Sequence, residues 1–252
     1  MELKVIAYAR NGFTDKFGIP RQSREENDIE TRIVFEPTYS VHEAIRGIEE
    51  FSHLWLLWGF SQSQMSRDYL GNVSRVNPVN AMHWSPTVRP PRLGGNKRVG
   101  VFATRSPFRP NPIGLTSVRL LRVEESTGKN GIELIVTGAD LLDGTPIYDI
   151  KPYLSFTDSH PDAKNGFAED TKDYRLKVEW NLSEGDQSRK RLVNVSNTPR
   201  KWLEEVSYIL SQDPRPAYQD DPEREYKLDY AGYTVTFVVK QQTVIVKKVE
   251  KL

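Results

Sequence analysis

The chain has 252 residues, a formal net charge of +1, 37% hydrophobic residues and no cysteine. The lack of cysteine excludes disulfides, thiolate catalysis and cysteine-based metal sites. No run of about 18 apolar residues occurs, which excludes a membrane-spanning helix. Lys4 and Arg10 interrupt the first apolar stretch, which excludes a signal peptide. We therefore expect a cytoplasmic protein with no membrane contact, long enough for one large domain or two modest ones.

The first third of the chain predicts three strands and one helix, with the strands at residues 3–10, 31–35 and 53–60. The last of these is a continuous apolar run whose length suits a buried strand. Ser40 and Glu43 have the spacing of a capping box, which predicts a helix that begins there and ends near Glu50.

The middle third continues the pattern of short strands. Residues 69–91 are mostly loop, residues 99–104, 115–123 and 132–137 are expected strands, and residues 125–131 form a hairpin turn. Asp143-Gly-Thr-Pro146 is a turn followed by an extended segment at residues 147–153. Closely spaced strands with one helix favour a β-barrel or sandwich. The motifs of Rossmann and P-loop nucleotide sites are absent from the sequence.

Residues 156–173 are polar and are expected to form a linker. Beyond them we expect a strand at 174–180 and further strands at 226–229, 233–240 and 243–249. Thr198 and Pro199 begin a helix as its N-cap and first residue, and its predicted buried face consists of Trp202, Val206, Ile209 and Leu210. The fold class is thus mainly β with some α (α+β). Its parts are a β-barrel at 1–157, a linker at 158–173 and a small α+β C-terminal domain at 174–252.

Between Asp68 and Glu124 the chain has nine lysines or arginines and no acid. Such an asymmetry in a nearly neutral chain indicates a polyanionic partner, and the cations would form a phosphate track for RNA or DNA. The alternative is a solvated face with arginines that pair with acids elsewhere. The candidate RNA contacts are Arg89, Arg92, Lys97, Arg98 and Arg109.

Within this zone lies Arg105-Ser-Pro-Phe-Arg-Pro-Asn-Pro112. Three prolines in six residues stiffen the segment. A stiff segment fits a binding loop and a plain turn between strands equally well, so both interpretations stay open. The turn at Asp143 leaves a similar choice, because its carboxylate could also hold a ribose diol or a cationic ligand. His53 is a better candidate for a boundary residue than for a ligand, and no metal is expected.

Several motifs together resemble the TsaA-like family. They are Ile19-Pro-Arg-Gln22, Ala44-Ile-Arg-Gly47, Phe51-Ser-His-Leu-Trp55, Arg89-Pro-Pro-Arg-Leu-Gly-Gly-Asn96, the Gly100–Leu115 block with its Arg-Pro-Asn-Pro-Ile-Gly-Leu sequence, and Asp143–Tyr153. They span residues 1 to about 160, and Asp213-Pro-Arg-Pro-Ala-Tyr218 extends the resemblance to the C-terminal part.

The resemblance implies a β-barrel that binds S-adenosylmethionine and acts as a homodimer. It implies methyl transfer to N6 of N6-threonylcarbamoyladenosine at position 37, next to the anticodon of tRNA. The cofactor contacts carried over by motif are Pro20, Arg21, Gln22, Ser61, Gln62, Arg105, Leu115, Asp143, Gly144, Thr145 and Pro146. The chain departs from the family at Ser61, where histidine is expected, and in a longer loop at residues 64–83.

The methyl acceptor is a weakly nucleophilic nitrogen, so the rate depends on positioning an in-line attack and on a nearby base. The candidates for that base are Asp143, Tyr148 and Asp149. Two other functions stay open: an RNA-binding β-barrel without chemistry, and a barrel that binds a nucleotide-like metabolite as a regulator.

Overall fold

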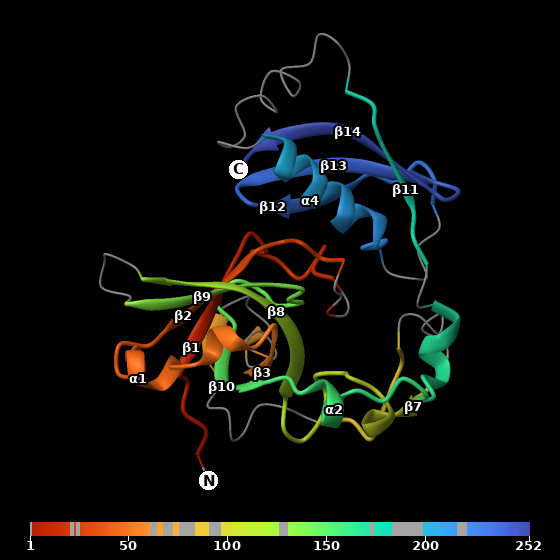
Figure 1. The fold of residues 1–252 in the computed structure, drawn as a ribbon. Coiled ribbons are helices and arrows are strands. Elements are labelled where there is room, and N and C mark those ends of the chain that lie inside the picture. The colour runs from red at the N-terminus through yellow and green to blue at the C-terminus, as the bar shows by residue number, and fades with distance from the viewer. Residues whose placement is uncertain are drawn as a thin grey trace.

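The main parts of the described fold are a closed β-barrel and a separate four-stranded sheet with one long helix against it (Figure 1). The computed structural model describes residues 2–20, 23, 26–60, 65–67, 73–75, 84–90, 97–125, 131–171, 174–182, 199–215 and 221–252, and the statements below concern these residues. Within these ranges, no helix has the length and apolar character needed to cross a bilayer.

Six antiparallel strands close the barrel in the order β1-β10-β3-β8-β9-β2. Their bounds are β1 Ala7–Arg10, β2 Thr31–Phe35, β3 His53–Gly59, β8 Ile113–Glu125, β9 Ile132–Thr137 and β10 Pro146–Pro152. Alternate side chains of β3 are fully buried, among them Leu54 and Leu56, because alternate residues of a strand point to opposite faces. They form the barrel core with Ile33, Leu134 and Ile147.

Shorter elements lie between the barrel strands or follow the last of them in the chain. They are α1 His42–Ile45, η1 Ile48–Glu50, α2 Ser155–Asp158, η5 Gly166–Thr171, and the strand pairs β4 Met65–Arg67 with β5 Val73–Arg75 and β6 Thr87–Val88 with β7 Val99–Gly100. The 3-10 turn η4, Val101–Ala103, follows β7 directly and leads into the proline-rich loop. This loop lies on the side of the barrel that faces away from the C-terminal sheet (Figure 1).

The C-terminal sheet has the order β11-β14-β13-β12, with β11 parallel to β14. Its strands are β11 Lys177–Trp180, β12 Tyr226–Tyr230, β13 Tyr233–Lys240 and β14 Thr243–Lys251, and α4 spans Pro199–Ser211. The predicted apolar face of α4 is confirmed, because Trp202, Val206, Ile209 and Leu210 are all buried in the core that the helix shares with this sheet.

The connection between β1 and β2 leaves the barrel and enters the C-terminal core. Phe13 and Ile29 are buried there, and the Phe13 ring lies 5.1 Å from that of Tyr230. The Ala231 N–H also donates to the Gly12 carbonyl at 3.0 Å. In Figure 1 this connection rises from the barrel toward β12. The barrel and the C-terminal sheet are therefore joined by side chains that sequence reasoning had assigned to the barrel.

Several expected local features are wrong. Ser40 does not cap a helix, because its hydroxyl accepts from the Ile132 N–H at 2.7 Å. The helix is only the four residues of α1, with Val41 as an N-cap that makes no side-chain bond. The expected strand at 99–104 stops at Gly100, and the first strand begins only at Ala7. The expected linker contains short helical segments, and its role as a linker stays a prediction.

Candidate active site

Ser23, in the loop expected to hold the cofactor, contacts β8. Pro20 is buried, and the Ser23 hydroxyl donates a short hydrogen bond to the Ser117 carbonyl. Leu115 lies two residues earlier on the same face of β8, and 53% of it is exposed. Arg21 and Gln22 of this loop fall outside the described residues, as do Ser61 and Gln62 after β3. The structure thus brings the described part of the loop onto the strand that carries Leu115.

A chain of hydrogen bonds runs from the barrel core to this loop. The indole Nε1 of Trp58 donates to Thr116 Oγ1 at 2.9 Å, and Thr116 Oγ1 donates to Asp140 Oδ1 at 2.7 Å. The backbone N–H of Ser23 also donates to the Asp140 carboxylate. Asp140 therefore connects β3 and β8 with the expected cofactor loop.

Gly114 makes this chain possible. It pairs with Trp58 across β3 and β8, and a Cβ atom there would lie 2.6 Å from Cδ2 of the indole. The missing side chain leaves room for the ring to lie over β8 and reach Thr116, two residues further along the strand and 3% exposed.

Burial raises the pKa of Asp140 above that of an ordinary aspartate. Hydrogen bonds from Thr116, from its own backbone amide and from Ser23 act in the opposite direction, and so does the positive charge of Arg105. Arg105, itself exposed in the proline-rich loop, is therefore close enough to act electrostatically on this carboxyl group.

Arg109 braces the proline-rich loop from inside. Its Nε donates to the Ser106 carbonyl at 3.0 Å, and its Nη2 donates to the carbonyls of Val101, at 3.1 Å, and Thr104. Because these donors are used within the loop, the geometry gives Arg109 the role of holding the loop that presents Arg105. Its expected RNA contact stays a prediction.

The turn at residues 143–146 is attached to the end of β1. Asp143 Oδ1 accepts from the Asn11 N–H at 3.1 Å, and Asp143 Oδ2 lies 3.6 Å from Arg10 Nη1. Gly144 has a φ of +76° and donates to the Ala9 carbonyl at 2.8 Å, while Thr145 is 2% exposed. Pro146 begins β10 opposite Tyr8. The turn shares the connection between β9 and β10 with Asp140.

The other two candidate bases lie on β10. A register shift between Ile147 and Asp149 leaves Tyr148 as a bulged residue, and burial, followed by the nearby Tyr8, raises its pKa. A phenol of raised pKa stays protonated at neutral pH and can donate a hydrogen bond. Asp149 forms an ion pair with Lys151 at 2.8 Å.

The basic zone divides into two groups. Arg89, Lys97 and Arg98 are exposed, and Arg98 Nη1 donates to Thr87 Oγ1 at 3.0 Å. Arg122 instead pairs with Glu124 at 2.7 Å and Glu30 at 3.3 Å, so the alternative of arginines neutralised by acids holds for this residue. Arg92 lies outside the described residues.

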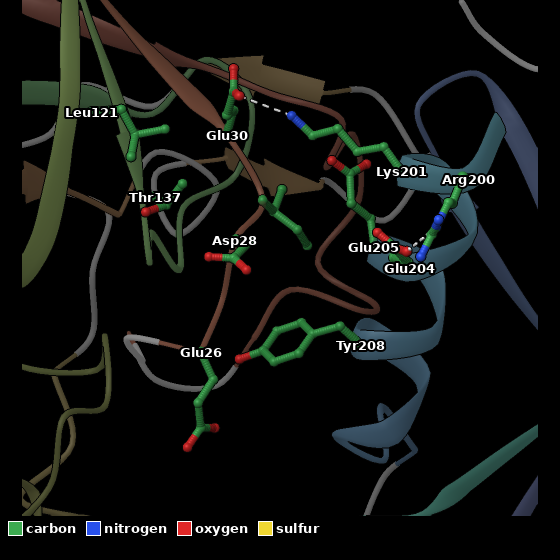
Figure 2. Close-up of a pocket in the computed structure, with 11 residues that line it drawn as sticks. Glu26, Asp28, Glu30, Leu121, Thr137, Arg200, Lys201, Glu204, Glu205 and Tyr208 are labelled. Carbon is green, nitrogen blue, oxygen red and sulfur yellow. Dashed lines mark hydrogen bonds and ion pairs between the residues drawn. The ribbon is translucent and has the colours of Figure 1, made fainter. Parts of the chain in front are cut away.

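A cleft of about 640 Å³ lies between the barrel and α4 (Figure 2). Five carboxylates line it, and Glu30 pairs with Lys201 at 2.9 Å. Burial raises the pKa of Glu205, which accepts from the Tyr230 hydroxyl at 2.9 Å. None of the expected site residues lines this cleft, and its acidity suits neither an RNA backbone nor an anionic ligand.

Sequence reasoning missed Asp140 and Ser23. The available signal was an acid placed between the buried Ala139 and Leu141, three residues before the recognised turn, since a carboxylate between buried residues needs hydrogen-bond partners. Within the described residues, no three His, Asp or Glu side chains gather as a metal site would require.

Comparison with known proteins confirms the family resemblance. Residues 8–159 match the tRNA-methyltransferase O N-terminal domain, and residues 173–252 match the TrmO C-terminal domain. A tRNA (adenine(37)-N6)-methyltransferase of Eikenella corrodens is 40% identical over 79% of this chain and 97% of its own. A putative S-adenosylmethionine-dependent methyltransferase, RcsF, of Pseudomonas aeruginosa is 39% identical over 88% of this chain and 85% of its own.

A solved structure agrees in fold as well. The crystal structure of TrmO from Pseudomonas aeruginosa superposes with a TM-score of 0.72 at 31% identity, covering 99% of this chain and 98% of that one. With both of its domain models matched in order along the sequence, the chain belongs to the tRNA-methyltransferase O family.

Proposed function

We propose that this protein is an S-adenosylmethionine-dependent tRNA methyltransferase that methylates N6 of N6-threonylcarbamoyladenosine at position 37. The family match and the names of the relatives support the reaction. The observation that carries the site is the contact of Ser23, at the end of the expected cofactor loop, with β8, the strand that carries Leu115.

The residues assigned to the site fit the chemistry of the cofactor. S-adenosylmethionine has a sulfonium cation, an ammonium, a carboxylate and an apolar adenine face, and it supplies an electrophilic methyl group when bound. Arg105 would pair with its carboxylate, and Asp143 offers the negative charge that its cationic groups require. The exposed side chain of Leu115 would cover the adenine. Pro20, Gly144, Thr145 and Pro146 would shape the walls, with Arg21, Gln22, Ser61 and Gln62 assigned by resemblance.

The protein's part in the reaction is to position the acceptor nitrogen and to handle its proton. The three candidate bases differ in suitability, because the raised pKa of Tyr148 makes its phenol a donor at neutral pH. We therefore assign Tyr148 to orienting the acceptor, and a carboxylate, Asp143 or Asp149, to removing the proton.

The anticodon arm would bind the exposed cations of the basic zone. Arg89, Lys97 and Arg98 stand on the loop segments around β6 and β7, next to the proline-rich loop that holds Arg105. Phosphate contacts there would position the arm and leave recognition of the modified base to the site itself.

We also propose a homodimer. The support is the family resemblance and three large exposed rings on the loops near β6 and β7: Trp84 at 50%, Phe102 at 77% and Phe108 at 55%. The Ser85 N–H donates to the Phe108 carbonyl at 3.1 Å, which joins the backbone segments that carry Trp84 and Phe108. Neighbouring exposed aromatic groups are typical of a surface that a partner covers. Light scattering on the purified protein measures the subunit number directly.

The test of the reaction is mass spectrometry of nucleosides from tRNA of a strain lacking the gene, with the purified protein added back to that tRNA. We expect the methylated nucleoside to be missing and to return only when S-adenosylmethionine is supplied. A protein that binds this tRNA but restores no methyl group would be the non-catalytic RNA-binding module. A protein that binds the cofactor with no regard to tRNA would be the regulator.

A further inference from the structure

Phe102 presents a large apolar ring to solvent. It is 77% exposed on the 3-10 turn η4, whereas its neighbour Val101 is 1% exposed. Single exposed apolar side chains are common on protein surfaces and need no explanation. Two properties distinguish this ring from such side chains: the rigidity of the turn that carries it, and the positive charges that precede and follow it in the chain.

The turn that carries the ring is held by several hydrogen bonds. The Val101 N–H donates to the Pro86 carbonyl at 3.0 Å. The Val101 carbonyl accepts from the Thr104 N–H at 3.1 Å, from Thr104 Oγ1 at 2.8 Å and from Arg109 Nη2 at 3.1 Å. The backbone around Phe102 is therefore fixed before any ligand binds, so little conformational entropy is lost there when a ligand covers the ring.

Cations flank the turn on both sides. Lys97 and Arg98 precede it, Arg105 follows it, and all three are exposed. No acid lies between Asp68 and Glu124 in the sequence. An exposed aromatic ring between exposed cations is typical of proteins that bind single-stranded nucleic acid, in which the cations contact phosphates and the ring stacks on a base.

Phe156 shows that exposure alone does not define such a site. Its ring is 86% exposed on α2. It lies two positions before Asp158, and no lysine or arginine occurs between Lys151 and Lys164. A negative charge beside a ring disfavours the approach of a phosphate backbone. The two rings thus share their exposure and differ in their charged neighbours, which makes Phe156 a matched control for Phe102.

We infer that Phe102 is a nucleobase-stacking residue, whose ring stacks on an unpaired base of the anticodon loop while the neighbouring cations contact phosphates. The inference rests on the proposed function for the identity of the RNA, to which it adds a contact with a base. Bases of a single-stranded loop can leave their own stack at low cost. Because every base has a π face, stacking positions the loop and does not select its sequence.

A second copy of this chain is the other candidate to cover the ring. If the ring lay at a two-fold axis, the cations around it would face the same cations of the second copy, and like charges repel each other. The charge around Phe102 therefore favours RNA as the occupant. Trp84 and Phe108, which are exposed by 50% and 55%, stay available to the proposed homodimer.

Three substitutions of one ring test the inference: Phe102→Ala, Phe102→Leu and Phe102→Trp. Fluorescence anisotropy with a labelled tRNA that carries the threonylcarbamoyl group measures their affinity. Loss of one stacked base predicts a dissociation constant raised about fivefold to a hundredfold for Phe102→Ala. Phe102→Leu keeps an apolar side chain without a ring face and should bind almost as weakly, whereas Phe102→Trp should bind like the wild type. Phe156→Ala should have no effect.

The salt dependence separates stacking from phosphate contact. Stacking on a base releases no counterions, so Phe102→Ala should weaken binding by the same factor at every salt concentration and leave the slope of log affinity against log salt unchanged. Lys97→Ala with Arg98→Ala should reduce that slope. In methyl-transfer assays, Phe102→Ala should raise the KM for tRNA, and calorimetric titration should show an unchanged affinity for S-adenosylmethionine.

The outcomes distinguish this inference from the proposed function. A wild-type protein that binds tRNA without transferring a methyl group would end the proposed function alone, and the anisotropy comparison would still decide the role of Phe102. Equal affinity of Phe102→Ala and the wild type for tRNA would overturn the inference, and so would equal affinity of Phe102→Leu and Phe102→Trp. A changed subunit number of Phe102→Ala in light scattering would also overturn it, because the ring would then lie between two copies of the chain.

Discussion

Gly59, at the end of β3, lies against the phenol of Tyr148, and a Cβ atom on this glycine would be 2.8 Å from Cζ of that ring and closer still to its hydroxyl. Adding one methyl group must therefore displace Tyr148 from its bulged position. Overpacking of this kind costs about 1–3 kcal/mol. We expect Gly59→Ala to lower the melting temperature and the methyl-transfer rate together.

The companion variant is Gly59→Ala with Tyr148→Leu, whose shorter side chain leaves room for the methyl group. The melting temperature of this double variant should lie above that of Gly59→Ala alone. A single variant as stable as the wild type would contradict the close approach of these two residues.

Arg105→Ala is expected to lower methyl transfer by more than tenfold while the melting temperature stays within about 1 °C, because the side chain is exposed and the surrounding loop is held by Arg109. A labelled-methyl assay on tRNA that carries the threonylcarbamoyl group measures the rate. Arg109→Ala should lower methyl transfer and, unlike Arg105→Ala, also loosen the loop. Faster hydrogen exchange at residues 101–109 would detect this loosening. Wild-type turnover in Arg105→Ala would overturn the site assignment.

Affinity for tRNA is expected to fall steeply with salt, since each phosphate neutralised by a lysine or arginine releases counterions. Lys97→Ala with Arg98→Ala should weaken binding and reduce the slope of log affinity against log salt by roughly one to two. Fluorescence anisotropy at several salt concentrations gives the slope. As a control, Lys247→Ala and Lys248→Ala on β14 should leave it unchanged. A flat response in the wild type would rule out a phosphate track.

The stability difference between Asp140→Asn and the wild type should depend on pH. The folded pKa of Asp140 is raised, so the folded protein binds this proton more tightly than the unfolded chain does. The ionised group therefore lowers stability as pH rises from the ordinary aspartate value through the raised one. Asparagine does not ionise, so the stability of the variant lacks this dependence on pH. We expect melting temperatures from about pH 4 to about pH 8 to shift in favour of the asparagine variant; a constant difference would contradict the raised pKa.

Phe13→Ala is expected to destabilise the protein by about 3–5 kcal/mol. The ring is 1% exposed, comes from the connection between β1 and β2, and fills part of the C-terminal core. Because it joins the two structures, its loss should split a single thermal transition into two, which scanning calorimetry resolves. Phe156→Ala, at a ring 86% exposed, is the matched control and should change little.

The sequence predicted the elements whose pattern is local. The strand at residues 31–35 has the expected bounds, and the buried face of α4 consists of the expected residues. An alternating spacing of apolar residues determines the first, and a helical spacing determines the second. Ser40 shows the limit of such reasoning. Its spacing from Glu43 fits a cap, yet its hydroxyl bonds with Ile132, a residue ninety-two positions away.

The assignment of the site residues stays a prediction, but the structure brings parts of two of its motifs together. The motifs indicated Leu115 and the loop at residue 20, and the structure places the end of that loop on the strand of Leu115. Asp140 could not be predicted, because its role depends on Thr116 and Ser23, which approach it only after the barrel closes and the connection from β1 folds back. The packing of Phe13 in the C-terminal core could not be predicted either, because no local sequence pattern indicates which sheet an apolar side chain will pack against.

The route of the chain from Arg10 to Thr31 has a consequence for separating the two halves of the protein. The proposed cofactor loop lies midway along a segment with Phe13 and Ile29 on either side, both buried in the C-terminal core. A barrel produced without residues 174–252 would leave these two side chains in water and the loop between them without its two fixed points. Cutting the protein at its linker should therefore impair donor binding at a site whose proposed contacts are all on the retained half.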